Sequence, residues 1–137
     1  SLKDWATRRL KMPQDPASLP KWGTAGFGPE RRILLHVKGY DRPVLVHVSD
    51  KVTVGRFDTE TGLAPDVDLD SYNALELGVS RRHITLLIAD DALKVIDLES
   101  ANATFINGQR LIPHQARILR DGDELRLGRM VMRVQFV

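Results

Sequence analysis

The sequence of 137 residues contains no cysteine. This absence excludes disulfide bonds, thiolate metal sites and cysteine nucleophiles, and it fits a cytoplasmic protein. No apolar run approaches the roughly 18 residues that a membrane-spanning helix needs, and the start of the chain has no signal-peptide pattern. We therefore expect a cytoplasmic protein without a membrane partner.

A spaced set of metal ligands is also missing. Three histidines stand singly, and we interpret each as solvent-facing or hydrogen-bonded rather than as a ligand: His36, His47 and His114. The long acidic segment 57–79 contains "DVDLD" (residues 66–70), which resembles the start of an EF-hand loop. However, Ser71 stands where such a loop has glycine, and Leu77 stands where it has a bidentate glutamate. We predict no metal and no cofactor.

Catalytic signatures are weak. Ser80 and His83 could suggest a hydrolase, but the sequence contains no G-x-S-x-G motif. A serine nucleophile also needs an oriented base and an oxyanion hole, and residues three apart on an extended strand point to opposite faces. We predict that the chain is not an enzyme, with a hydrolase as the competing hypothesis.

Charge is distributed unevenly along the chain. Residues 1–32 carry seven basic and three acidic residues, whereas the remainder carries thirteen basic and fifteen acidic residues. We predict a flexible basic tail over residues 1–32, with a Pro/Gly-rich linker and a possible short helix over residues 2–12, followed by a domain over residues 33–137. Because nucleic-acid-binding domains are usually basic, we expect no nucleic-acid partner, and binding through the tail is the alternative.

From Ile33 onward the hydrophobic pattern has a period of two. In residues 44–48 three valines alternate with Leu45 and His47, and residues 84–88 alternate in the same way. Turn signals separate the runs, and Asn107-Gly108 is typical of a type I′ hairpin. Nine to eleven short strands with turns every 8–12 residues predict an all-β sandwich or barrel.

Arginine and serine gather next to these strands. Arg56 ends one predicted strand, and Ser80, Arg81 and Arg82 precede another. Loops from different strands meet at one end of a sandwich, so these side chains could surround one anion. A phosphate carries about −1.5 to −2 charges, and arginine matches its oxygens bidentately. The pattern favours phosphate recognition.

The motifs "GR", "SRRH" and "NATFING", together with "RDGDELRLGR", resemble the forkhead-associated (FHA) domain over about residues 33–137. The resemblance implies a β-sandwich of about eleven strands in two sheets. It also implies binding of phosphothreonine peptides through the loops at one end. The expected partner is a phosphothreonine-containing protein, which implies a Ser/Thr kinase pathway. The alternative is a phospho-independent protein interaction module.

The resemblance assigns roles to individual residues. Arg56 and Ser80 match the family's phosphate ligands, and Arg81 and Arg82 match positions that contribute phosphate and peptide contacts. Asn102 matches the residue that bonds the ligand backbone and shapes the position three residues after the phosphothreonine.

Other positions match supporting residues or depart from the family. Gly55, His83 and Asn107 match residues that hold the loops. Ala101 stands beside Asn102 where the family often has threonine, so it offers the peptide only its backbone. Ala103 replaces a family glycine and would be strained if that position needs a positive φ.

Overall fold

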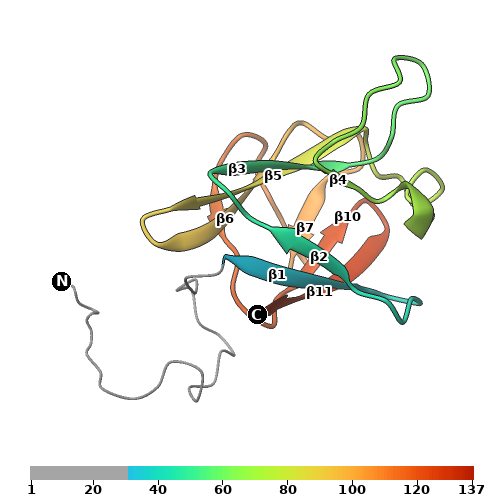
Figure 1. Ribbon diagram of the computed structural model, residues 1–137. Helices are drawn as coiled ribbons and strands as arrows, with labels where there is room; N and C mark the ends of the chain where they lie inside the picture. Colours follow the sequence, from blue (N-terminus) through green and yellow to red (C-terminus); the bar gives the residue numbers. More distant parts are fainter. Residues whose placement is uncertain (1–30) are drawn as a thin grey trace, which may run out of the picture.

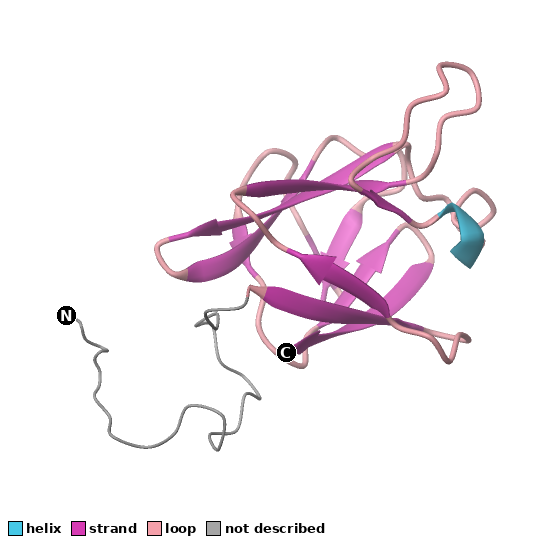
Figure 2. Cartoon of the chain, viewed as in Figure 1, coloured by secondary structure: helices cyan, strands magenta, loops and turns pink. Residues whose placement is uncertain are grey.

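The computed structural model describes residues 31–137. The helix predicted over residues 2–12 and the linker before residue 31 lie outside this range. The strands are β1 (Arg32–Val37), β2 (Val44–His47), β3 (Lys51–Gly55), β4 (Val67–Asp68), β5 (Arg82–Ala89), β6 (Ala92–Asp97), β7 (Thr104–Ile106), β8 (Gln109–Arg110), β9 (Arg117–Ile118), β10 (Glu124–Leu127) and β11 (Met130–Phe136). One short 3₁₀ helix, η3 (Asp70–Tyr72), accompanies them (Figure 2). The predicted all-β class is confirmed.

The eleven strands form two sheets that face each other (Figure 1). The six-stranded sheet has the order β2-β1-β11-β10-β7-β8, and the five-stranded sheet has the order β4-β3-β5-β6-β9. Every strand pair is antiparallel except β3 with β4, which is parallel. The architecture is the predicted two-sheet β-sandwich.

The core lies between the sheets because the apolar residues alternate along the strands. Val46 and Val48 are buried and Leu45 is exposed, and Ile84 and Leu86 are fully buried, as the period of two predicts. Burying each such aliphatic side chain stabilises the fold by about 1.5–3 kcal/mol. Removing one, as in Leu86→Ala, would cost about 2–5 kcal/mol.

The turns explain how strands follow one another. Asn107 and Gly108 join β7 to β8 with φ values of 50° and 82°, as a type I′ turn requires, so this prediction is confirmed. Asp90 and Asp91 join β5 to β6 with φ values of 56° and 59°. By contrast, the segment between β2 and β3 connects two different sheets and forms no hairpin.

The strand directions gather four loops at one end of the sandwich. Gly55 at the end of β3 lies opposite Arg82 at the start of β5, and Asp97 at the end of β6 lies opposite Ile84. In the second sheet, Thr104 at the start of β7 lies opposite Leu127 at the end of β10. The four loops therefore contain residues 56–66, 73–81, 98–103 and 128–129. No helix in residues 31–137 is long and apolar enough to span a bilayer.

Candidate functional site

Arg56 is held in place by its own side chain. Its Nε–H donates to the carbonyl oxygen of Val79 over 2.7 Å, and its backbone N–H donates to the carbonyl of Arg81 over 3.2 Å. These bonds leave the two terminal Nη groups free to donate. No carboxylate of the described residues lies within ion-pair distance of Arg56, so its charge is available to an anion at the loop end.

Ser80 lies beside Arg56 and is oriented by the loop after β6. Its Oγ accepts a hydrogen bond from the backbone N–H of Ala101 over 3.1 Å. The hydroxyl proton has no acceptor among residues 31–137 and is available to a ligand. The backbone of Ala101 thus lies at the site, where it orients the serine.

His83 is fully buried directly behind Ser80. Its Nδ1 accepts from the backbone N–H of Ser80 over 3.0 Å, and its Nε2–H donates to the carbonyl of Ala103 over 3.0 Å. This bonding pattern requires the neutral ring with the proton on Nε2. Burial lowers the pKa of His83, against the opposing effects of the Ala103 carbonyl and the carboxylate of Asp97.

Ala103 and Asn102 complete the connection between loops. The carbonyl of Ala103 accepts a second bond, from the N–H of Gly128 over 3.0 Å. Ala103 has a φ of 69°, the left-handed conformation that a glycine would adopt without strain. The side-chain amide of Asn102 donates to the carbonyl of Gly78 over 3.0 Å, so Asn102 joins two loops at the exposed surface.

A β-bulge at His83 interrupts the pairing of β3 with β5, directly after the two neighbouring arginines. Val54 pairs with Ile84, but Gly55 pairs with Arg82, so the register shifts at His83. Without this shift, strict alternation would place Arg82 on the core side with Ile84. The bulge instead directs Arg82 to the outer face of the sheet and His83 to the interior.

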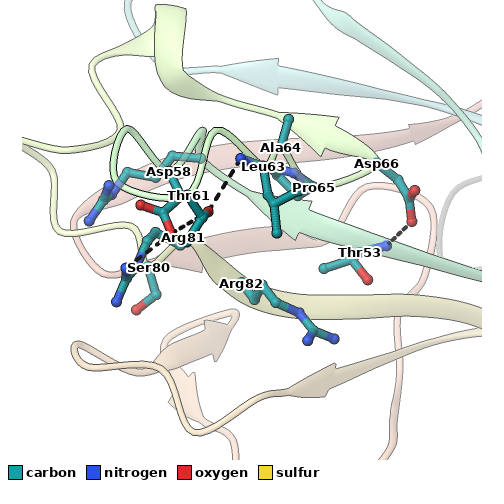
Figure 3. Close-up of a pocket in the computed structure, with 11 residues that line it drawn as sticks. Thr53, Asp58, Thr61, Leu63, Ala64, Pro65, Asp66, Ser80, Arg81 and Arg82 are labelled. Atoms are coloured by element: carbon teal, nitrogen blue, oxygen red, sulfur yellow. Dashed lines mark hydrogen bonds and ion pairs between the residues drawn. The ribbon is translucent and has the colours of Figure 1, made fainter.

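Arg81 already has acidic partners. Its Nη1 donates to Oδ2 of Asp58 over 3.1 Å and lies 3.7 Å from Oε1 of Glu60. The hydroxyl of Thr61, the backbone N–H of Glu60 and the charge of Arg81 hold the pKa of Asp58 below its usual value, despite an opposing effect of desolvation. Figure 3 shows Arg81 beside Ser80 and Asp58, whereas Arg82 points away from them. Sequence reasoning grouped these arginines, and the structure brings only Arg81 next to Ser80.

An open pocket of about 560 Å³ extends from Arg56, Ser80 and Arg81 along the outer face of β3 and β5 (Figure 3). We call Arg56, Ser80 and Arg81 the loop-end site. The adjoining part, which we call the side pocket, is lined by Thr53, Leu63, Ala64, Pro65, Asp66 and Arg82. The projecting loop 56–66 forms its outer wall (Figure 1).

The FHA domain family model matches residues 52–128, more than half of the chain. The chain belongs to the FHA domain family. Residues 52–128 include Arg56, Ser80, His83 and Asn102, so the matched region covers three loops of the candidate site in full and the first residue of the fourth.

Curated relatives of this FHA domain are longer proteins. Protein FraH of Nostoc sp. is 37% identical over 67 residues, which are 49% of this chain and 23% of that protein. The oxoglutarate dehydrogenase inhibitor of Corynebacterium glutamicum is 33% identical over 54 residues, which are 39% of this chain and 36% of that protein. The matches therefore span well under half the length of either relative.

Solved FHA domains share the architecture. One, from work on phosphothreonine-dependent FHA domain interactions, is 25% identical with a TM-score of 0.59 and covers 77% of this chain and 97% of that chain. The N-terminal FHA domain of S. cerevisiae Rad53, solved with a phosphothreonine peptide, is 19% identical with a TM-score of 0.59 over 77% of this chain and 94% of that chain. This second likeness shows the fold alone.

Gly55 and Asn107 of the FHA domain were predicted to support the site, and the structure places them at opposite ends of the sandwich strands. Gly55 lies where a Cβ would approach the carbonyl oxygen of Arg81 to 2.1 Å, so only glycine fits between β3 and the loop before β5. Asn107 is not near the loop-end site. Its side chain bonds Asp123 and the backbone of Glu124, which stabilises the β7–β8 turn at the other end of β7.

Asp97 is a supporting residue that sequence reasoning missed. It is buried at the end of β6, where its carboxylate accepts bonds from the hydroxyls of Ser100 and Thr104 and from the N–H of Ser100. These bonds shape the loop that presents Ala101 and Asn102. An acidic residue at the end of an apolar run, followed by serine and threonine, was the available signal.

The aspartates of the acidic segment 57–79 hold nearby backbone in place through hydrogen bonds. Asp66 accepts the N–H of Thr53 over 2.9 Å, and Asp68 accepts the N–H groups of Phe57 and Asp70 over 3.0 and 2.9 Å. Residues 31–137 contain no group of three or more acidic or histidine side chains that could hold a metal ion. Asp66 and Asp68 of "DVDLD" instead accept hydrogen bonds from backbone N–H groups of β3 and of the neighbouring loops.

Proposed function

We propose that this domain binds phosphothreonine-containing proteins, with the phosphate held at the loop-end site. The observation that carries this proposal is the arrangement of Arg56 and Ser80. Arg56 is anchored through Nε with both Nη groups free, and Ser80 is oriented with its hydroxyl proton free. A phosphate dianion offers acceptor oxygens to these free donors, and its negative charge balances that of Arg56.

The donors are pre-organised. Arg56 is held by Val79, and Ser80 is held by His83 and Ala101, so a ligand would order few side chains. Pre-organisation lowers the entropic cost of binding. Arg81 would contribute a further contact after exchanging its bond with Asp58, and Asn102 would bond the peptide backbone through its free amide oxygen.

The proposal is supported by the relatives' ligands. The Rad53 domain was solved with a phosphothreonine peptide, and a second structural match comes from work on phosphothreonine-dependent interactions. Carried to this chain, these ligands imply a partner that a Ser/Thr kinase has modified. We propose such a signalling role for the domain. We place its boundary slightly before the predicted one, because β1 already begins at Arg32.

The geometry argues against serine catalysis. Nδ1 of His83 accepts a hydrogen bond from the backbone N–H of Ser80 and not from its hydroxyl, and the serine Oγ instead accepts from the N–H of Ala101. His83 therefore cannot act as general base for Ser80 in this arrangement. We propose a binding module and not an enzyme.

Calorimetric titration with matched peptides tests the proposal. A phosphothreonine peptide should bind, its unphosphorylated counterpart should not, and a phosphoserine counterpart should bind about fourfold more weakly, because one buried methyl group contributes about 0.8 kcal/mol. Equal binding of the phosphorylated and unphosphorylated peptides would instead establish a phospho-independent interaction module. A gel-shift assay with and without residues 1–32 tests nucleic-acid binding through the tail.

A further inference from the structure

The side pocket lies next to the loop-end site but is chemically different from it. Thr53 of β3 and Arg82 of β5 form its inner surface, and Leu63, Ala64 and Pro65 of the projecting loop form the opposite wall (Figure 3). Leu63 is 69% exposed, so its side chain is available for contact with a ligand. This combination offers an apolar surface with one cation beside it.

Arg82 is the cationic side chain that lines the side pocket. Its guanidinium makes no ion pair or side-chain hydrogen bond with any other residue in 31–137, whereas Arg81 is paired with Asp58 and Glu60. The register shift at His83 places Arg82 on the outer face of the sheet, opposite Gly55 and on the same side as Thr53. Arg82 therefore faces a partner that lies over β3 and β5.

The carboxylates of the pocket are already bonded. Asp58 accepts from Arg81 and Thr61, and Asp66 accepts from the backbone of Thr53. The whole open pocket is lined by three arginines and two aspartates, and the side pocket itself by Arg82 and Asp66. Because Asp66 bonds the backbone of β3, Arg82 is the charge of the side pocket that is left without a partner in residues 31–137. An anionic side chain complements this charge better than a cationic one.

The loop that forms the wall is anchored at both ends. Asp58 accepts from the N–H of Glu60 and the hydroxyl of Thr61 near its start, and Asp66 bonds β3 at its end. Leu63 is held between these anchors by a backbone bridge to Asp58. The apolar wall is a defined surface against which a side-chain stem can pack.

The position of Asn102 indicates which part of a peptide reaches the side pocket. Asn102 contacts Gly78 and is not among the residues that line the pocket. The FHA resemblance assigns Asn102 to residues that follow the phosphothreonine. The residues that precede the phosphothreonine must then leave the loop-end site on the other flank, where the side pocket lies.

We propose that the side pocket selects an acidic residue within three positions before the phosphothreonine. The aliphatic part of a glutamate would pack against Leu63 and Pro65, and its carboxylate would pair with Arg82. This inference rests on the proposed function, because the phosphothreonine positions the peptide. An extended chain advances about 3.3 Å per residue, so three residues reach about 10 Å from the phosphothreonine.

The test compares phosphothreonine peptides that carry Glu, Ala or Lys at each of the three preceding positions on an otherwise alanine background. Fluorescence polarisation gives the ratio of Glu-peptide to Lys-peptide affinity for each protein. For the wild type, we expect the Glu peptide to bind about three- to fivefold more tightly at one position, the range for a partly exposed charge pair. Arg82→Glu should invert this ratio, and Arg82→Gln should bring it close to one.

Arg110→Glu is the matched control, since it makes the same charge change at an exposed site on β8. An unchanged wild-type ratio in this variant supports a local pair, whereas an inversion equal to that of Arg82→Glu would show long-range electrostatics and overturn the proposal. Equal wild-type affinities for the Glu, Ala and Lys peptides would also overturn it. If the proposed function itself is wrong, the result is different, because the wild type then does not bind the all-alanine phosphothreonine peptide.

Discussion

The backbone N–H of Ser80 donates to Nδ1 of His83 over 3.0 Å. Through the opposite ring nitrogen, the same imidazole reaches the carbonyl of Ala103. One buried side chain thus connects the loop before β5 with the loop after β6. The geometry of the loop-end site depends on the neutral state of this ring, because a protonated Nδ1 cannot accept from Ser80.

His83→Gln should lower the free energy of unfolding by about 1–3 kcal/mol at pH 7.5, since it leaves buried backbone groups of Ser80 or Ala103 without a partner. The difference from the wild type should shrink as the pH falls below about 6.5. The folded state has a lowered His83 pKa, so the unfolded wild type takes up the proton first and the wild type loses stability with acidification. Thermal melts of both proteins between pH 5 and 8 measure this, and a difference independent of pH would contradict it.

Arg56→Ala should weaken phosphothreonine-peptide binding by about a hundredfold while leaving the fold intact. Two charge-assisted bonds to phosphate contribute on the order of 3 kcal/mol together. Arg56→Lys is the informative companion, because lysine keeps the charge but carries its donors on a single nitrogen and lacks the planar fork that bonds Val79 and two phosphate oxygens together. Titration of both variants should place the lysine variant between alanine and the wild type. Unfolding of Arg56→Ala would assign this residue a structural role.

Ser80→Ala should cost less, about 1–2 kcal/mol of binding free energy, or a loss of roughly five- to thirtyfold. The variant loses the hydroxyl donor and also the acceptor for the N–H of Ala101. Ser80→Thr keeps the hydroxyl and should retain more affinity. Matched titrations check the order wild type, threonine, alanine, and an unaffected alanine variant would place the phosphate elsewhere.

Gly55→Ala should destabilise the domain by at least about 2 kcal/mol, since the new Cβ would lie 2.1 Å from the carbonyl oxygen of Arg81. The displaced backbone also bonds Arg56, so peptide affinity should fall with stability. Gly39→Ala is the control, because no atom lies within 4 Å of its added Cβ. Its positive φ costs about 1–2 kcal/mol, but it should leave binding unchanged. Equal losses of binding in the two variants would show that the close approach of Gly55 to Arg81 does not support the site.

Ala103→Gly should have little effect on stability, whereas Ala92→Gly should cost about 1.3–1.8 kcal/mol. Both alanines are similarly buried, at 7% and 8% exposure, so each loses a methyl group worth about 0.8 kcal/mol and gains the flexibility of glycine, worth about 0.5–1 kcal/mol. Only Ala103 has a positive φ, whose relief returns about 1–2 kcal/mol. Chemical denaturation of the two variants decides this, and equal losses would show that Ala103 is unstrained.

The sequence predicted the features that depend on local patterns and on the joint motif. Alternation identified Val46 and Val48 in and after β2 and Ile84 and Leu86 of β5 as core residues. Asn107-Gly108 identified a hairpin turn. The motif also predicted that His83 turns inward to support Ser80. Each of these follows from residues that are close in sequence or that recur in a known arrangement.

Other features depend on tertiary placement and could not be read from the pattern. The ion pair between Arg81 and Asp58 joins residues 23 positions apart, and it exists only because the loop 56–66 folds back toward β5. Likewise, a register shift of one residue decides that Arg82 faces outward. The resemblance gave both arginines the same role, and regular pairing with a period of two would have placed Arg82 on the core side.

The parallel pairing of β3 with β4 has a consequence for how recognition can diversify. The segment between these strands begins and ends at positions that the sheet itself holds. The entropic cost of closing a loop grows only with the logarithm of its length, so insertions or deletions near Leu63 would perturb the sandwich little. Arg56 and Ser80, by contrast, are bonded to rigid neighbours. Evolution or engineering could therefore retune the choice of sequence around the phosphorylated residue while the recognition of the phosphate itself stays constant.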